Sequence, residues 1–364
     1  MEISGLKYYT KQVPNPDSIV EHKNMTGDYP DLIADIPEPY SDLLANVPAL
    51  INAPQTWNVT VSDAKFHWYD LVAGFPSIPD IRDPVGRYLR RMQFDLEATA
   101  EKRLLYFVVT RPRVRFDAKR ATQWGFFSLK LTIPLLVGVQ EERQHVTIEL
   151  EVPFAATLKK PVVTLSEHFV TLNWGGLVEA LSIHDVLQNY DNDVKFPSKL
   201  LYVGQTKDPA GRLPKARLTA VQKLHQQHSE DSDMLLLIQR MNVTVTSDEG
   251  DPADLPENQN PVAVDALTKD RMDLIECALI KYFEEPSTRT RSAQEMLARR
   301  GRIIEVQAAH KVAGFRIDLR LAQAGKYHEL QSERVAASRA HIIDCVVLGG
   351  EIGVTRVVPE KVKA

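Results

Sequence analysis

Three residues carry side chains suited to chemistry at a phosphate group: Tyr202, Arg212 and Glu276. Tyr202 begins the run Tyr-Val-Gly-Gln-Thr, Arg212 follows that run by six residues, and Glu276 lies far downstream within Glu-Cys-Ala-Leu-Ile-Lys-Tyr-Phe. A phenol can exchange a proton, a guanidinium can donate two charge-assisted hydrogen bonds, and a carboxylate can hold a metal ion. These residue types in this order indicate a site that handles phosphate groups.

The first two side chains lie on elements that would bring them together. Residues 199–204 form a short apolar and aromatic run, which predicts a strand, and residues 207–211 hold the Asp, Pro and Gly of a turn. A helix is expected from Arg212 to about His228, with Pro214 in its first turn. Because a helix N-terminus carries partial positive charge, Tyr202, Arg212 and this helix end would converge on one anion.

Glu276 is expected on a second helix. Apolar residues recur at three-and-four spacing from Ile275 to Tyr282, and Glu276 borders or enters that apolar stripe. Carboxylates in such places are uncommon unless they are paired or bound to metal. The alternative is a glutamate at the edge of the stripe that is paired with a nearby cation. The candidate cations are Arg212, Arg271 and Lys281.

Over roughly residues 168–300 the chain resembles the GIY-YIG nuclease family. Tyr202 and Gly204 match the second tyrosine motif, and Arg212 falls where the family arginine falls. The Glu276 helix, with Pro286 soon after it, is similar to the helix that carries the metal-binding glutamate. The resemblance implies hydrolysis of phosphodiester bonds on a small antiparallel sheet flanked by helices. It also implies tyrosines from two strands, an arginine, a histidine and one glutamate holding a single divalent metal.

The family's first tyrosine motif, a Gly-apolar-Tyr about ten residues before the second, does not precede Tyr202. Residues 168–174 predict the first strand instead, and residues 177–188 predict an inserted helix. The general-base tyrosine is then either replaced or supplied by Tyr190, which lies in a polar stretch.

Two further family positions differ. Ala216 stands where the family histidine often lies, and His225 could replace it, the alternative being a surface histidine satisfied by other partners. No Asn occurs after Asn260, so Ser287 or Thr288 would have to supply the hydrogen bond of the family asparagine. These differences leave open whether the chain cleaves a substrate.

If the site is active, a tyrosinate or His225 accepts a proton from water, and Arg212 offsets the charge of the transition state. Glu276 would hold one Mg²⁺ or Mn²⁺ ion that keeps most of its waters. The residues with implied catalytic roles are Tyr202, Arg212, His225, Glu276 and Tyr190. The residues with implied substrate contacts are Gly204, Thr206, Lys215, Arg217, Arg289 and Arg291.

Net charge gives no overall attraction to nucleic acid, because the 364-residue chain carries about −4. Binding would need local basic patches, and two are candidates, although both could also be solvated helix and strand faces. The first patch is Arg289, Arg291, Arg299, Arg300 and Arg302. The second patch is Arg82, Arg87, Arg90, Arg91, Arg103, Arg111, Arg113, Arg115, Lys119 and Arg120, interspersed with Tyr88, Tyr106, Phe116 and Trp124.

The pattern divides the chain into four parts of overall α+β class. Residues 1–55 are rich in Pro and Asp and suggest an N-terminal arm. Residues 56–165 predict a β-rich recognition or assembly domain with a helix near residues 84–98 and strands at 104–109, 126–131, 145–152 and 162–165. Residues 166–305 are the GIY-YIG-like domain. Residues 306–364 are a C-terminal extension. Around it we expect strands at 303–307, 315–321 and 342–348 and a helix near 330–340.

Two cysteines, Cys277 and Cys345, give no disulfide framework, which favours the reducing cytoplasm. Apolar runs are shorter than a membrane span, so no membrane partner is expected. The expected partners are nucleic acid, DNA rather than RNA, and a protein bound through the β-rich domain. The oligomeric state stays open, with a homodimer as one alternative, because a one-site enzyme that cuts both strands often acts as a pair.

Two functions from different classes remain. The first is a metal-dependent endonuclease, of the kind used in defence or repair, whose β-rich domain selects the substrate. The second is a catalytically silent relative that binds nucleic acid or a protein partner within a larger assembly. The missing first motif, the missing asparagine and the acidic balance favour the second. A smaller third alternative is an accidental match in a structural protein.

Overall fold

The structure of the chain is a computed structural model that describes residues 55–74, 79–97, 104–190, 194, 196–206, 219–228, 230–247, 261–284, 293–320 and 329–357. All of these residues belong to one compact unit, residues 49–364. The predicted arm, apart from residue 55, lies outside the described residues.

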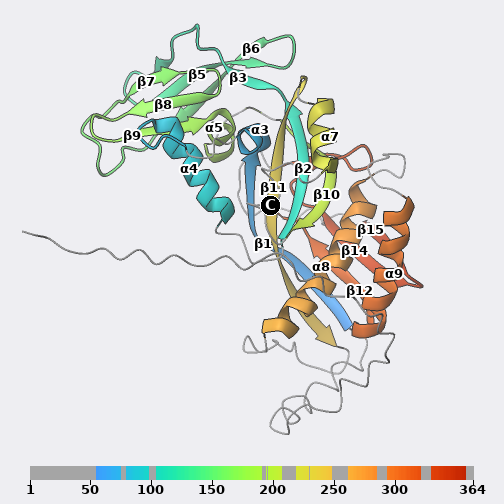
Figure 1. Ribbon diagram of the computed structural model, residues 1–364. Coiled ribbons are helices and arrows are strands. Elements are labelled where there is room, and N and C mark those ends of the chain that lie inside the picture. Colours follow the sequence, from blue (N-terminus) through green and yellow to red (C-terminus); the bar gives the residue numbers. More distant parts are fainter. Residues whose placement is uncertain are drawn as a thin grey trace, which may run out of the picture. The chain divides into compact units, whose positions relative to one another are not determined.

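An eight-stranded, curled sheet runs through this unit (Figure 1). Its pairings are antiparallel except for β1 with β12 and β10 with β13. The order across the sheet is β13 (Leu330–Gln331), β10 (Ser198–Thr206), β2 (Leu104–Pro112), β11 (Ser232–Ser247), β1 (Gln55–Trp68), β12 (Val312–Asp318), β14 (Ile342–Leu348) and β15 (Glu351–Val357).

The sheet joins segments that the sequence assigned to different domains. Strands β1 and β2 come from the predicted β-rich domain, β10 and β11 from the GIY-YIG-like domain, and β12, β14 and β15 from the region of the extension. A mixed fold of helices and strands is therefore confirmed. The division at residues 56, 166 and 306 is not confirmed, because backbone hydrogen bonds link all three parts into one sheet.

Helices cover both faces of the sheet around β2, and this explains why residues 104–111 of that strand are all buried. Leu105 and Phe107 point into a core formed with α8 (Pro261–Phe283) and α9 (Ala293–His310). Tyr106 and Val108 point into a second core on the opposite face. The helices that contribute to this second core are α3 (Tyr69–Ala73), α4 (Pro84–Glu97) and α7 (Thr219–His228).

A β-rich insert, residues 113–197, separates β2 from its sheet neighbour β10. The insert has its own apolar core, and in Figure 1 its green strands lie beyond the end of β2. A capping box at Ser182 and Asp185 starts its helix α5 (Ile183–Asn189). Its strands are β3 (Val114–Phe116), β4 (Gln123–Trp124), β5 (Lys130–Val137), β6 (Glu142–Glu149), β7 (Val162–Leu165), β8 (Phe169–Asn173) and β9 (Val178–Ser182).

Most predicted elements are present, including the strands near residues 104, 162, 169, 199 and 342 and the helices near residues 84 and 276. Four predictions were wrong. The strand predicted at residues 126–131 begins only at Lys130, where β5 starts. Residues 178–182 form β9, so the predicted helix begins only after its cap at Ser182. Residues 303–307 continue α9, because Ile303 and Val306 lie three residues apart on its buried side. Residues 330–340 hold the short strand β13 and turns, without a helix.

Candidate functional site

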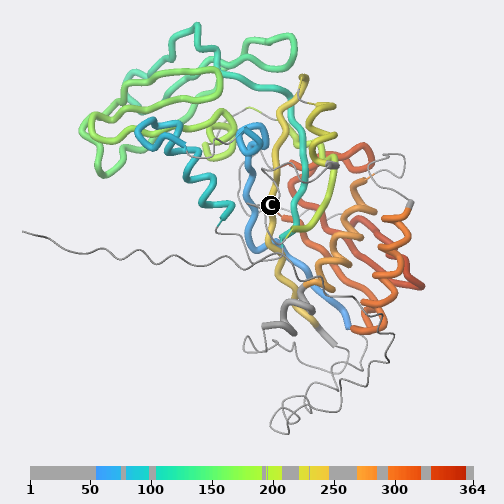
Figure 2. Tube along the Cα trace, viewed as in Figure 1, coloured from blue at the N-terminus to red at the C-terminus, as the bar shows by residue number. Residues whose placement is uncertain are grey.

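A second tyrosine lies beside Tyr202. Strands β2 and β10 run side by side (Figure 2), with Gly204 opposite Tyr106 and Tyr202 opposite Val108. The ring centroids of Tyr106 and Tyr202 are 6.2 Å apart. A Cβ atom on Gly204 would lie 2.5 Å from the Tyr106 hydroxyl, so glycine is required for the Tyr106 ring to cross β10 there.

Sequence reasoning named Tyr106 only as an aromatic residue of the second basic patch and did not pair it with Tyr202, because the whole insert separates the two. The usable signal was the run Leu-Leu-Tyr-Phe-Val-Val, a strand buried on both faces that carries a tyrosine. Tyr190, the expected substitute, ends α5 and packs against the core of the insert, where burial raises its pKa. The structure therefore pairs Tyr202 with Tyr106 and places Tyr190 in the insert.

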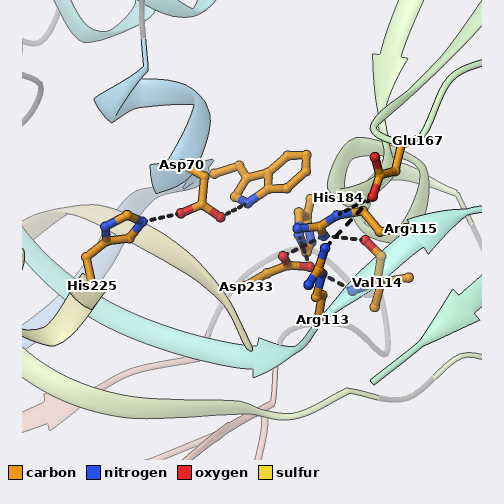
Figure 3. Close-up of polar contacts among 9 residues, drawn as sticks. Asp70, Arg113, Val114, Arg115, Glu167, His184, His225 and Asp233 are labelled. Carbon is orange, nitrogen blue, oxygen red and sulfur yellow. Dashed lines mark hydrogen bonds and ion pairs between the residues drawn. The ribbon is translucent and has the colours of Figure 1, made fainter. Parts of the chain in front are cut away.

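His225 lies on the same side of the sheet as the two tyrosines, on α7. Its Nε2 atom is 2.6 Å from Oδ1 of Asp70, and Oδ2 of Asp70 accepts a hydrogen bond from Trp68 Nε1 at 2.8 Å (Figure 3). The Tyr69 ring packs against His225 edge-on at 5.2 Å. Asp70 thus fixes the orientation of a half-buried histidine, which the sequence left as either a base or a surface residue.

Glu276 is buried, with 6% of its surface exposed, and both of its carboxylate oxygens are bound. Oε1 accepts from Arg299 Nη2 at 3.1 Å, and Oε2 accepts from Gln205 Nε2 at 3.1 Å. The cation bound to Glu276 is thus Arg299, a member of the first predicted basic patch, and not one of the three expected cations. The alternative in which Glu276 is a paired glutamate at the edge of the apolar stripe matches this geometry.

Glu276 belongs to an α8–α9 ion-pair network formed by Asp270, Asp273, Glu276, Arg299 and Arg302. The three carboxylates recur at every third residue of α8, and the two arginines lie three residues apart on α9. Arg302 donates from Nε to Asp273 Oδ2 at 2.8 Å and is also paired with Asp270. This hydrogen bond to Asp273 raises the pKa of Arg302. This regular pairing joins two helices and indicates a structural role.

The sheet separates Tyr202 from Glu276. Tyr202 and Tyr106 pack in the core on the α7 face, while α8 packs against Phe107 and Val203 on the opposite face. The Tyr202 ring therefore lies on the α7 face, while Glu276 approaches the sheet from the α8 face, where Gln205 binds it. The described residues do not bring the two groups to one phosphate.

Other predicted site residues are divided between the described and undescribed parts. Thr206 is buried at the end of β10. No group of three or more His, Cys, Asp or Glu side chains that could hold a metal occurs among the described residues. With both Glu276 oxygens bound, these residues do not fit the expected Mg²⁺ or Mn²⁺ site. The predicted residues outside the described ranges are Arg212, Lys215, Arg217, Arg289 and Arg291.

Several arginines of the second predicted basic patch have structural partners. Arg111 is buried, donates to Ser198 at 2.7 Å and lies over the Phe66 ring. Arg87 donates to the carbonyl of Val178 at 3.0 Å. Arg111 and Arg87 thus contact other parts of the protein.

A buried junction network joins the insert to the sheet at Asp233 (Figure 3). Its carboxylate accepts from the Val114 backbone N–H at 2.8 Å and from Arg115 Nη1 at 2.6 Å, and lies 3.1 Å from His184 Nε2. Burial alone would raise the pKa of Asp233, but the hydrogen bonds and charges of His184 and Arg115 outweigh it and lower that pKa. No sequence motif pointed to this network.

Comparisons of the chain with protein families, with curated proteins and with solved structures found no match. None of the helices in the described ranges is long and apolar enough to cross a membrane.

Proposed function

We propose that the chain binds nucleic acid through a GIY-YIG-like core and does not cleave it. One observation carries the second half of this proposal. Glu276, the residue expected to hold a metal, is bound through both oxygens to Arg299 and Gln205, on the sheet face opposite Tyr202.

The likeness to a GIY-YIG core is supported by the arrangement around Tyr202. Strands β10, β2 and β11 are three adjacent antiparallel strands, with α7 on one face and α8 on the other. Tyr106 supplies the tyrosine from a second strand that the resemblance requires, and Gly204 makes room for its ring. Nucleic acid is the ligand class that this resemblance implies.

The absence of cleavage follows from the cost of freeing Glu276. A metal ion on this carboxylate would have to displace the hydrogen bond from Arg299 or the one from Gln205. A hydrogen bond to a charged group contributes about 1.5–3 kcal/mol. The carboxylate would then still face away from Tyr202, so the metal and the phenol would act on different faces of the sheet.

A metal-dependent endonuclease is the second candidate, and one observation favours it. Tyr106, Tyr202 and the Asp70-oriented His225 lie on the same side of the sheet, which is where a proton acceptor for water would be needed. DNA would be the substrate of such an enzyme, with Mg²⁺ or Mn²⁺ as the ion.

A combined binding and cleavage assay separates the two candidates. Labelled single- and double-stranded DNA and RNA are incubated with the full chain in Mg²⁺, in Mn²⁺ and in a chelator, and both complex formation and product are measured. We expect complexes of equal affinity in metal and chelator, with no product.

Variants define what would overturn this proposal. Metal-dependent product that is lost in Glu276→Gln and Tyr202→Phe but kept in Asp270→Asn would establish the endonuclease. Asp270→Asn is the matched control because it alters the same α8–α9 network six residues before the proposed metal ligand. Absence of any complex with the wild-type chain would contradict the nucleic-acid ligand itself.

A further inference from the structure

Three phenylalanine side chains of the insert are almost completely exposed: Phe126 at 86%, Phe127 at 95% and Phe154 at 110%. They are the most exposed large apolar side chains in the described part of the chain. Scattered single exposed apolar residues need no explanation, but a group of rings with this exposure marks an interaction site. We call this group the aromatic tip.

The aromatic tip lies on two loops that are held together. Residues 125–129 connect β4 to β5, and residues 150–161 connect β6 to β7. The Leu150 backbone N–H donates to the Leu129 carbonyl at 3.0 Å, and Lys160 Nζ donates to the Gly125 carbonyl at 3.0 Å. The two loops therefore lie side by side where residues 150 and 160 contact the β4–β5 connection.

The segments around these rings carry a small excess of positive charge. Residues 117–130 and 149–161 hold five basic and three acidic side chains, although the whole chain carries about −4. Arg120 pairs with Asp117 and Lys130 pairs with Glu149, which leaves Lys119, Lys159 and Lys160 against Glu151. Lys160 also lies over the Trp124 ring at 5.7 Å from its centroid. Exposed aromatic rings among cations suit a polyanion with flat apolar groups, because the bases stack on the rings while the phosphates meet the cations. The basic residues are Lys119, Arg120, Lys130, Lys159 and Lys160.

The angle between two of the rings indicates the form of the polyanion. The rings of Phe126 and Phe127 are 4.5 Å apart at their centroids and inclined at 86°. Bases within a duplex are parallel and stacked on one another, so they cannot lie flat on two perpendicular rings. A single strand can turn between successive nucleotides and offer each ring its own base.

We propose that the aromatic tip binds single-stranded nucleic acid, with bases against Phe126, Phe127 and Phe154 and backbone phosphates near Lys159 and Lys160. This proposal rests on the proposed function in one respect, namely that the ligand class is nucleic acid. It adds the place of contact and the strandedness, neither of which involves the Tyr202 region.

Fluorescence anisotropy with labelled oligothymidylate and oligouridylate tests the proposal on the full chain. The variants are the double substitution Phe126→Ser and Phe127→Ser, and Phe154→Ser on the other loop. Val139→Ser is the matched control, because Val139 is an exposed apolar residue of the same insert, in the turn between β5 and β6. All substituted side chains are exposed, so circular dichroism and the melting temperature are expected to stay unchanged.

We expect Kd for the single strands to rise about tenfold for each ring removed, with no change for Val139→Ser. Duplexes of the same length should bind more weakly than single strands. Lys159→Glu should weaken binding and reduce its dependence on salt concentration.

Each other outcome has a defined meaning. Unchanged affinity in the phenylalanine variants would overturn the aromatic tip as the contact while leaving nucleic-acid binding in place. Cleavage of the bound strand would overturn the silent core and leave the aromatic tip standing. Binding to anionic phospholipid vesicles, lost in the phenylalanine variants and without any oligonucleotide binding, would reassign the tip to a lipid surface.

Discussion

Two buried carboxylates of this protein are held in contrasting ways. Asp233, in the junction network, has 0% of its surface exposed and is bound by a backbone N–H, an arginine and a histidine. Glu276, in the α8–α9 network, is bound by Arg299, whose side chain is 23% exposed, and by the amide of Gln205. The sequence motif pointed to Glu276, yet Asp233 is the more completely enclosed group. A residue that matches a catalytic motif can thus be held in an ion pair between two helices, as Glu276 is.

Asp233→Ala is expected to cause the largest loss of stability. The substitution leaves Arg115 and His184 next to a buried void without their acceptor, and removing one partner of a buried charged pair costs about 3–5 kcal/mol. Urea unfolding followed by circular dichroism measures the loss. A loss below about 1 kcal/mol, the size typical of an exposed pair, would mean that the junction network does not hold the insert on the sheet.

The same carboxylate should give the stability a dependence on acid pH. The pKa of Asp233 is lower in the folded protein than in the unfolded chain. Its contribution to the free energy of unfolding is therefore complete above the unfolded pKa and is lost as the pH falls through the folded pKa. The difference in unfolding free energy between wild type and Asp233→Asn should be largest near neutral pH and shrink below about pH 4. Chemical denaturation at a series of pH values checks this, and a constant difference would contradict it.

Glu276→Ala is expected to cost less, about 1–2 kcal/mol, because Arg299 can turn toward water. Oligonucleotide affinity should be unchanged, since the carboxylate lies on the face opposite Tyr202. Asp270→Ala, in the same network, is the matched control and should behave alike. If Glu276→Ala alone lost affinity while both variants kept their melting temperature, Glu276 would have to touch the ligand.

Asp344→Ala should have the smallest effect of the series. Asp344 pairs with Arg316 across β12 and β14 at the surface, with an Nε–Oδ1 distance of 2.6 Å, and water screens such pairs. We expect a change in melting temperature within the error of the measurement, and none at high salt. A clear loss of stability in Asp344→Ala would show that exposed pairs of this protein also contribute to its stability.

Local patterns predicted the elements that carry the candidate site. The apolar run before Gly204 and the stripe around Glu276 identified β10 and α8, because the spacing of apolar residues along a short segment reflects which side chains are buried. The spacing of Asp273 and Glu276, matched by that of Arg299 and Arg302, was also visible in the sequence and could have predicted the α8–α9 network. Using this spacing as a signal would have required knowing that α8 and α9 pack against each other.

Other features depend on contacts between distant segments and leave no local signal. Tyr106 meets Tyr202 only because β2 and β10 pair across the whole insert. Asp233 lies at the start of a strand, and the residues near it in sequence do not identify His184 or Arg115 as its partners. Exposure of Phe126 and Phe127 was equally hidden, since phenylalanine is ordinarily a core residue.

The position of the insert between β2 and β10 also bears on how fast the sheet can form. Joining these two strands closes a loop as long as residues 113–197, and closing a longer loop costs more chain entropy and slows folding. An insert that first collapses around its own core brings its two ends together and shortens the loop that remains to be closed. We therefore expect the insert to fold before the β2–β10 pair, so that mutations in its core slow the refolding of the whole sheet.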